Sequence, residues 1–282
     1  MTEARKQDIL LITLLGTAHG LSHYFHLIIP PLFPWIMPEF GTSFAEMGAV
    51  MTVFFITSSL GQAVSGIVVD KLGPRVCLYG GVSLLMIAGF LFSFAQNYWW
   101  FFPVAACAGL GNSVFHPTDF SIINRCISSE RLPFAFSIHF LVGNVGWALA
   151  PIIMVGVAGL TGSWRMAAAT AGLMALLVLI ALVLHNSLFA KALSEGNGLT
   201  PEEKKADEKA DVGFRFLKLL VVWLCFLFFF CNSFALGILQ NFAPSIFNAT
   251  YHVGLEIATG GLTAYMIGSI VGAVLGAYVA KA

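Results

Sequence analysis

Charged residues are scarce in this sequence, at 10% of 282 residues, whereas a soluble globular domain carries about 25%. Apolar residues make up 58% of the chain. Many of them fall in long runs of about 20 residues, which matches the hydrocarbon thickness of a bilayer. A soluble fold of this composition would expose more apolar surface than water tolerates. The scarcity of charge therefore predicts an all-α integral membrane protein, because helices close their own backbone hydrogen bonds inside the bilayer.

Other absences narrow the range of functions. The net charge is zero, so composition gives no reason to expect a nucleic-acid partner. The five cysteines are odd in number and lack paired spacing, so we expect neither a disulfide nor a cysteine-ligated zinc site. No nucleophile, metal or Walker-type phosphate motif is present in the sequence. We therefore expect no enzymatic activity and no cofactor.

Eight apolar segments are long enough to be candidate transmembrane spans. Their approximate bounds are 9–33, 45–69, 76–95, 99–123, 133–157, 164–186, 214–240 and 258–280. Turn-forming residues such as Gly73-Pro74 separate them. Arg5 and Lys6 precede the first run as in a signal peptide, but no small-residue cleavage site follows promptly. We therefore interpret this run as a retained first span.

The lysines and arginines predict how the spans are oriented. If the N-terminus is cytoplasmic, every basic residue except Arg165 falls on the cytoplasmic side, as the positive-inside rule requires. We expect a multi-pass protein of the plasma (inner) membrane, with Glu39 outside. Residues 187–213 are polar and charge-dense, which predicts a cytoplasmic linker that is partly helical around 201–210.

A weak internal repeat suggests the domain organisation. A shift of 210 residues aligns Pro34 with Pro244 and Gly66 with Gly276, in corresponding candidate spans. Parallel repeats about an axis along the membrane normal are one transporter architecture. The second copy holds two spans. We therefore expect a six-helix bundle over 1–186, the linker over 187–213, and the first two helices of a second bundle over 214–282.

A polar string lies between the second and third spans. It is the GxxxDKxGxR string formed by Gly66, Asp70, Lys71, Gly73 and Arg75. Gly66 would let two helices approach closely, Asp70 could pair with Arg75, and Gly73 begins a tight turn. The string resembles the signature loop of the major facilitator superfamily. That resemblance implies a secondary transporter, normally of two six-helix halves, in which this loop acts as a conformational latch.

Two further segments resemble branches of the same family. The fifth span contains Gly143-Asn144-Val-Gly146-Trp-Ala-Leu-Ala150-Pro151, which is similar to the proline-containing motif of drug/proton antiporters at Gly146 and Pro151. Ala150 departs from that motif, which has glycine there. The fourth span contains Gly109-Leu-Gly111-Asn112-Ser113-Val-Phe115-His116-Pro117, which resembles the Phe-His-Pro segment of the fosmidomycin-resistance branch. These resemblances favour export over import, with the export coupled to protons by antiport. They leave the identity of the substrate open.

Ionisable side chains inside the spans are few, and each is a functional candidate because a buried charge is costly unless paired or solvated. Three of them, His19, His23 and His26, share one face of the first span. Family resemblance implies that spans one, four and seven line the central cavity, with span five beside them. The predicted proton-coupling and substrate cavity comprises His19, His23, His116, Asp119, His139 and Asn144. We expect His19 and His23 near mid-membrane, and His116, Asp119 and His139 in the cytoplasmic third.

Less specific interpretations of these residues remain open. Each histidine could hydrogen-bond a carbonyl of a neighbouring helix, and Asp119 could pair with Arg125 or Arg131. A metal site from the three histidines of the first span is ranked low. No acid or cysteine completes it, and we expect no matching pair at the same depth on a second helix, so no metal is expected.

Two other functions also remain open beside proton-coupled export. One is a proton-coupled uptake symporter for an organic acid, and the other is a non-transporting receptor or assembly protein. The expected partners are a small-molecule substrate, protons and the lipid bilayer, and we expect a monomer.

Overall fold

The computed structural model describes residues 3–195 and 218–279, and every regular element in these ranges is helical. The first part contains α1 (Glu3–Phe25), η1 (Pro30–Leu32), α2 (Phe33–Phe40), α3 (Phe44–Leu72), α4 (Pro74–Ser93), η2 (Tyr98–Trp100), α5 (Phe101–Ser113), α6 (Phe115–Cys126), η3 (Ser129–Arg131), α7 (Leu132–Thr161), α8 (Trp164–Leu184) and α9 (Asn186–Glu195). The second part contains α11 (Leu220–Tyr251) and α12 (Leu255–Val279). The prediction of an all-α membrane fold is confirmed.

Six helices in the described ranges are long and apolar enough to cross a membrane. They are α3, α4, α7, α8, α11 and residues Leu255–Gly272 of α12. The first and fourth predicted spans are interrupted rather than continuous. The first span ends as a helix at Phe25, and Pro30 and Pro31 then begin a short 3-10 turn that leads into α2. Proline lacks the backbone N–H that would continue the earlier helix.

The interruption of the fourth span has a specific chemical cause. In a continuous α-helix the N–H of residue 117 would bond the carbonyl of Ser113, but Pro117 has no N–H. The hydroxyl of Ser65 on α3 instead reaches the Ser113 carbonyl at 3.1 Å, and it shares its single hydrogen with the carbonyl of Gln62 on its own helix at 2.9 Å. Helical bonding resumes when the N–H of Thr118 donates to the carbonyl of Val114 at 3.1 Å. A side chain of a neighbouring helix thus contacts the backbone at the break between α5 and α6.

Two helices, α11 and α9, differ from the predicted boundaries. The seventh span was expected to end at 240, but α11 continues through the buried Pro244 to Tyr251. It ends at His252, which has a left-handed backbone with φ of 53°. The first nine residues of the predicted linker, 187–195, belong to α9. The helix expected around 201–210 lies outside the described residues.

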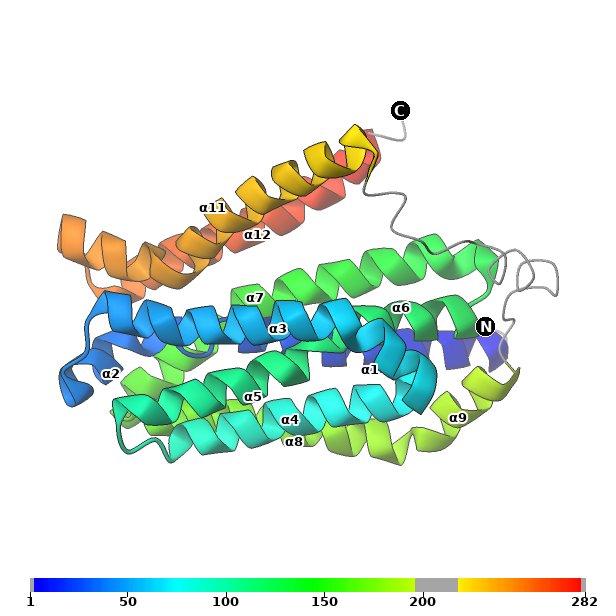
Figure 1. Ribbon diagram of the computed structural model, residues 1–282, viewed down its shortest axis with the longest axis horizontal. Coiled ribbons are helices and arrows are strands. Elements are labelled where there is room, and N and C mark those ends of the chain that lie inside the picture. Colours follow the sequence, from blue (N-terminus) through cyan, green and yellow to red (C-terminus); the bar gives the residue numbers. More distant parts are fainter. Residues whose placement is uncertain (1–2, 196–217, 280–282) are drawn as a thin grey trace.

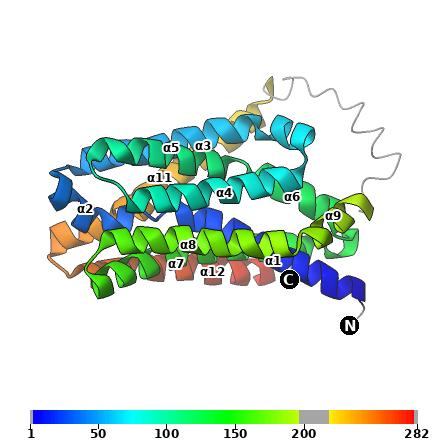
Figure 2. The ribbon, with the colours of Figure 1, turned by 90° about the horizontal axis from the view of Figure 1, so that it is seen from below.

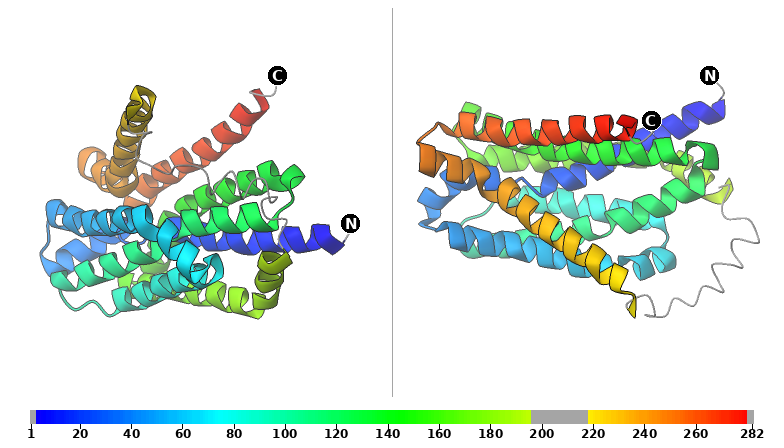
Figure 3. Two further views of the ribbon diagram at one scale, coloured as in Figure 1. Left: turned by 45° about the vertical axis from the view of Figure 1, so that its right-hand side comes forward. Right: turned by 90° about the horizontal axis from the view of Figure 1, so that it is seen from above.

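Helices α1 to α8 form one bundle whose members run along the long axis of the molecule (Figures 1 and 2). Within it α4 packs against α8, α1 against α7, and α3 against α5. The α11–α12 hairpin lies along one side of this bundle, and its two helices diverge from each other (Figure 3). Ala148 of α7 packs with Leu262 and Met266 of α12. Thus α7 joins the hairpin to the bundle.

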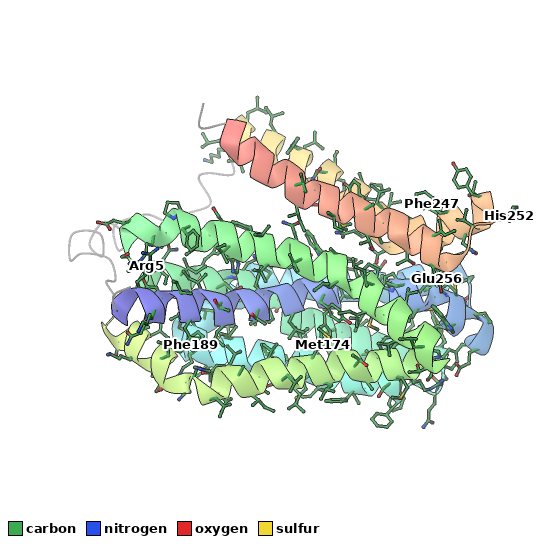
Figure 4. All side chains as sticks on the ribbon, turned by 180° about the vertical axis from the view of Figure 1, so that it is seen from behind. Arg5, Met174, Phe189, Phe247, His252 and Glu256 are labelled. Carbon is green, nitrogen blue, oxygen red and sulfur yellow. The ribbon has the colours of Figure 1, made fainter. Side chains whose placement is uncertain are left out.

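Each end of the bundle carries an ion pair that joins distant segments. At one end Arg131 pairs with Asp8 of α1. At the other, Glu39 accepts hydrogen bonds from Arg165 at 2.6 and 3.1 Å and from the indole N–H of Trp164 at 2.7 Å. Figure 4 likewise places Arg5 and Phe189 at one end and His252 and Glu256 at the other. Segments predicted to lie on opposite sides of the membrane are therefore at opposite ends.

Candidate functional site

A carboxylate and an imidazole meet in the centre of the bundle. Nδ1 of His19 on α1 lies 3.0 Å from Oδ2 of Asp119 on α6, and both side chains are fully buried. Asp119 lies in the second turn of α6, so the break between α5 and α6 determines where its carboxylate lies. Asp119 therefore joins two helices at a point where one of them is interrupted.

Further imidazoles surround this pair. The ring of His139 on α7 lies 3.7 Å from the ring of His19, and its Nε2 is 3.6 Å from Oδ2 of Asp119. The rings of His23 and His116 lie 4.4 and 5.1 Å from that of His19. The expectation that α1 and the later helices place these groups at different depths is therefore wrong. We call His19, His23, His116, His139 and Asp119 the central cluster.

Glycines on α7 make room for the central cluster. A Cβ added at Gly143 would lie 2.9 Å from Cε1 and Nδ1 of His23 and 3.0 Å from Cδ2 of His19. A Cβ added at Gly146 would clash with the backbone of Gly20 on α1. The absence of side chains at these positions lets α1 and α7 approach closely. Gly146, predicted from the antiporter-like motif, is thus a packing residue, and Pro151 lies buried further along the same helix.

A second polar chain leads from the cluster toward α3. The ring of His26 lies 5.4 Å from that of His23, and its Nε2 is 3.1 Å from Oδ1 of Asn112. The amide of Asn112 in turn donates to the hydroxyl of Ser58 on α3 at 2.7 Å. Ser58 was not predicted as a site residue, because an isolated serine in an apolar run carries no distinctive signal. The three side chains connect the turn after α1 with α5 and α3.

Asn144 does not join the central cluster, although it was predicted as a cavity residue. Its side-chain amide donates to the carbonyl of Phe140 on its own helix at 3.0 Å. One helical turn away, the indole of Trp147 stacks on His23 with ring centroids 4.2 Å apart. An aromatic ring of α7 therefore contacts the cluster.

The alternative ion pairs suggested for Asp119 are not formed. Within the described residues its charged or ionisable contacts are His19 and His139, whereas Arg131 pairs with Asp8. Oδ1 of Asp119 is buried and lacks a hydrogen-bond partner.

One nitrogen each of His19, His116 and His139 lies within 4.8 Å of the others, so these three could hold a metal ion. Asp119 is thus a buried acid surrounded by imidazoles.

The predicted gating loop forms the turn between α3 and α4. Gly73 has a φ of 84°, a left-handed conformation that glycine adopts without strain, and Pro74 begins α4. Asp70 is exposed and does not pair with Arg75 within the described structure. Among the described residues no atom lies within 4 Å of a Cβ built on Gly66, so the expected close helix approach is not formed there. Lys71 is likewise exposed.

Two cavities lie between the bundle and the α11–α12 hairpin. One, of about 620 Å³, lies between α3 and α11 and is lined by Met51, Phe55, Phe230, Ser233 and Asn241 among others. Its wall residue Phe55 contacts His26, with ring centroids 6.0 Å apart. The other, also of about 620 Å³, lies between α7 and α12 around Pro151 and Thr263. The first cavity therefore adjoins the polar chain that leads to the central cluster.

The chain combines membrane-spanning helices, two interrupted helices and a buried imidazole–carboxylate cluster. These features define a polytopic membrane protein with the features of a transporter. Residues 15–282 match the model of the Major Facilitator Superfamily, and the chain belongs to that family. Its members are transporters rather than enzymes. The prediction of the family from the GxxxDKxGxR string is confirmed.

Known proteins similar to this chain cover it to different extents. The uncharacterized MFS-type transporter YfnC of Bacillus subtilis is 24% identical over 270 residues, which are 94% of this chain and 64% of that protein. The fosmidomycin resistance protein of Escherichia coli is 30% identical over 139 residues, 49% of this chain and 34% of that protein. The chain therefore spans less than two thirds of the length of these curated relatives.

A solved structure supports the fold. The crystal structure of peptide transporter POT in complex with sulfate has a TM-score of 0.57 to this chain at 19% identity. The match covers 96% of this chain and 50% of that one. At this identity the likeness establishes the fold and says nothing of the substrate.

Proposed function

We propose that this chain is a proton-coupled secondary transporter that exports a small organic molecule by alternating access. The observation that carries the proposal is the buried carboxylate of Asp119, held between His19 and His139 at the break between α5 and α6. An ionisable group inside a membrane bundle is costly and is a functional candidate for that reason. Asp119 is the proposed proton-binding residue.

The contact between Asp119 and His19 suggests how a bound proton would act on the helices. An ionised carboxylate only accepts hydrogen bonds, whereas a protonated one also donates. Proton binding at Asp119 therefore changes the bond to Nδ1 of His19 and with it the contact between α6 and α1. Histidine suits an adjoining relay because its ordinary pKa lies near physiological pH. Proton release on the other side would restore the first arrangement.

The substrate is proposed to bind in the cavity between α3 and α11. Aromatic walls at Phe55 and Phe230 suit an apolar part of a molecule, and Ser233 and Asn241 supply hydrogen-bonding groups. The contact of Phe55 with His26, and the ring contact of His26 with His23, offer a physical connection from this cavity to the central cluster. The turn at Asp70, Lys71, Gly73 and Arg75 is proposed as a cytoplasmic latch.

Export is favoured over uptake by two likenesses. Gly146 and Pro151 resemble the antiporter motif, and one relative is a fosmidomycin resistance protein. Removal of a compound from the cell is a direct route to resistance. Uptake of an organic acid by symport and a receptor without transport are the alternatives, and the direction of proton-driven flux distinguishes all three.

The proposal is tested with membrane vesicles of both orientations, using labelled fosmidomycin and labelled gluconate as probes. We expect inside-out vesicles containing this chain to accumulate fosmidomycin when their lumen is acidic, and to lose it when a protonophore is added. Vesicles without the chain are the control. Gluconate uptake by right-side-out vesicles in an acidic medium would support the symporter instead. Absence of proton-driven flux of both probes would support the receptor.

A further inference from the structure

Three imidazoles from three helices converge inside the bundle. His19 of α1, His116 of α6 and His139 of α7 each place one ring nitrogen within 4.8 Å of the other two. These residues are 97 and 23 positions apart along the chain, so the fold and not local helix geometry brings them together. The sequence predicted no metal, on the expectation that no second helix carries histidines at the depth of those in α1. Helices α6 and α7 supply them.

Three ring nitrogens of this group are buried and lack a hydrogen-bond partner among the described residues. They are Nε2 of His19 and both ring nitrogens of His139. The side chains of His19 and His139 are 0% and 1% exposed. Buried polar atoms are normally paired, because an unpaired one loses its solvation without compensation. A ligand that accepts lone pairs would compensate these atoms.

Asp119 orients one of these imidazoles. With the carboxylate ionised, Nδ1–H of His19 donates to Oδ2 at 3.0 Å, and the lone pair on Nε2 is left free. A carboxylate bonded to the far nitrogen of a metal-binding histidine is the usual supporting arrangement, because it fixes the tautomer and the ring orientation. The central cluster thus already contains an oriented ligand and its supporting acid.

We infer that His19, His116 and His139 form a binding site for a divalent transition-metal ion of the Zn²⁺ type, with Asp119 as the residue that positions His19. Imidazole suits zinc, copper, cobalt and nickel, and three imidazoles leave a fourth coordination position for water. Zinc–nitrogen bonds of about 2.0–2.1 Å place tetrahedral ligand atoms about 3.3 Å apart. The three nitrogens must therefore draw slightly closer, which the half-buried ring of His116 permits.

A bound ion would tie α1, α6 and α7 together. These helices carry the central cluster, so the ion would hold α1 fixed against both partners and reduce any flux that requires α1 to move. The inference stands on the geometry of the imidazoles and does not depend on the proposed transport. Metal binding and flux can therefore fail independently of each other.

The test uses the whole chain, purified in detergent through a tag without histidine. Zn²⁺ is titrated by calorimetry, and Co²⁺ is followed by its visible absorption, which is intense for tetrahedral sites. We expect one saturable site per chain. We also expect affinity to fall at least tenfold in His139→Gln and in His116→Gln, and by about 10–100-fold in Asp119→Asn. His185→Gln, outside the cluster and directly after the C-terminal end of α8, should bind as the unchanged chain does.

X-ray absorption of the unaltered, zinc-loaded chain identifies the zinc ligands directly. This test therefore needs no variants, which could fail to fold. The expected spectrum shows scattering from three imidazoles around the ion. Saturable binding with fewer than two imidazoles in the shell would overturn the inference. So would a lack of saturable binding, or equal affinity in His139→Gln, His116→Gln and the unchanged chain.

Discussion

Nδ1 of His19 lies 3.0 Å from Oδ2 of Asp119, although the two residues are 100 positions apart in the chain. Both side chains are fully buried, and Nε2 of His139 lies 3.6 Å from the same carboxylate oxygen. This contact joins α1 to α6 directly beside the break that separates α5 from α6. A change in the charge of either group would therefore change the interactions of helices on both sides of the break.

The close fit of α7 against the histidines predicts that Gly143→Ala is destabilising. The added methyl group would lie 2.9 Å from the ring of His23 and 3.0 Å from that of His19, so both rings must shift. Overpacking of this kind costs about 1–3 kcal/mol. We expect a lower midpoint in thermal unfolding of the detergent-purified chain, followed by tryptophan fluorescence.

The matched control is Gly156→Ala on the same helix, where no atom of the part of the chain that the structure describes lies within 4 Å of the added methyl group. Its unfolding midpoint should equal or exceed that of the unchanged chain, because alanine is the better helix former. Equal midpoints for the two variants would show that the rings of His19 and His23 move aside freely.

The proline break predicts a specific coupling between Ser65 and Pro117. In Ser65→Ala the Ser113 carbonyl loses the hydroxyl, shared with the Gln62 carbonyl, that stands in for the missing N–H of Pro117, at a cost of about 0.5–1.5 kcal/mol. In a Pro117→Ala background the backbone N–H is restored, and the same serine substitution should cost less. Unfolding free energies of the four proteins form a double-mutant cycle. An interaction energy near zero would mean that the hydroxyl of Ser65 is dispensable for the break.

The ion pair at the end of α2 predicts how stability depends on pH. Hydrogen bonds from Arg165 lower the pKa of Glu39, with a smaller contribution in the same direction from Trp164. The ionised form is favoured in the folded state. The stabilisation is therefore present above the ordinary glutamate pKa of about 4.3 and is lost as pH falls through the lowered value.

This dependence is measured as the difference in unfolding midpoint between the unchanged chain and Glu39→Gln across pH. The difference should favour the unchanged chain near neutral pH and shrink in acid. It should be small, because both side chains are 38% exposed and solvent screens the pair. Glu130→Gln, which removes an exposed acid at the opposite end, is the control. A difference that grows in acid would contradict the assignment.

The distribution of basic residues predicts the sidedness of the membrane. Gln96 and Asn124 are exposed at opposite ends of the bundle. A membrane-impermeant maleimide added to intact cells should label Gln96→Cys and leave Asn124→Cys unlabelled, with the unchanged chain as the baseline for its native cysteines. Labelling of Asn124→Cys alone would invert the proposed orientation.

Much of the fold was predictable because the length of an apolar run sets the length of a helix. The predicted span 45–69 corresponds to α3, and its start is fixed by a capping box between Ser43 and Glu46. The span 164–186 corresponds to α8. Glycine and proline positions locate the turn at Gly73. These features are local, so the sequence alone determines them.

The arrangement of the site was less predictable because it depends on how helices rotate and shift against each other. The depth of His19 relative to Asp119 follows from packing of α1 on α7, which no apolar run specifies. Gly16 and Gly20 on α1 form a small-residue pair at i, i+4, and with Gly143 they signal this close contact. Gly66 carries the same kind of signal without a neighbour, so glycine spacing identifies candidates and not contacts.

The central claim is that Asp119 couples proton movement to transport, and Asp119→Asn tests it most directly. Asparagine retains the shape and most of the hydrogen bonding of aspartate but cannot carry a proton. The experiment compares two assays in the same vesicles, uphill fosmidomycin flux driven by a pH gradient and counterflow without net proton movement. Asp8→Asn, which breaks the ion pair with Arg131 away from the cluster, is the control. We predict that Asp119→Asn abolishes uphill flux while counterflow survives, and uphill flux at the unchanged rate would contradict the claim.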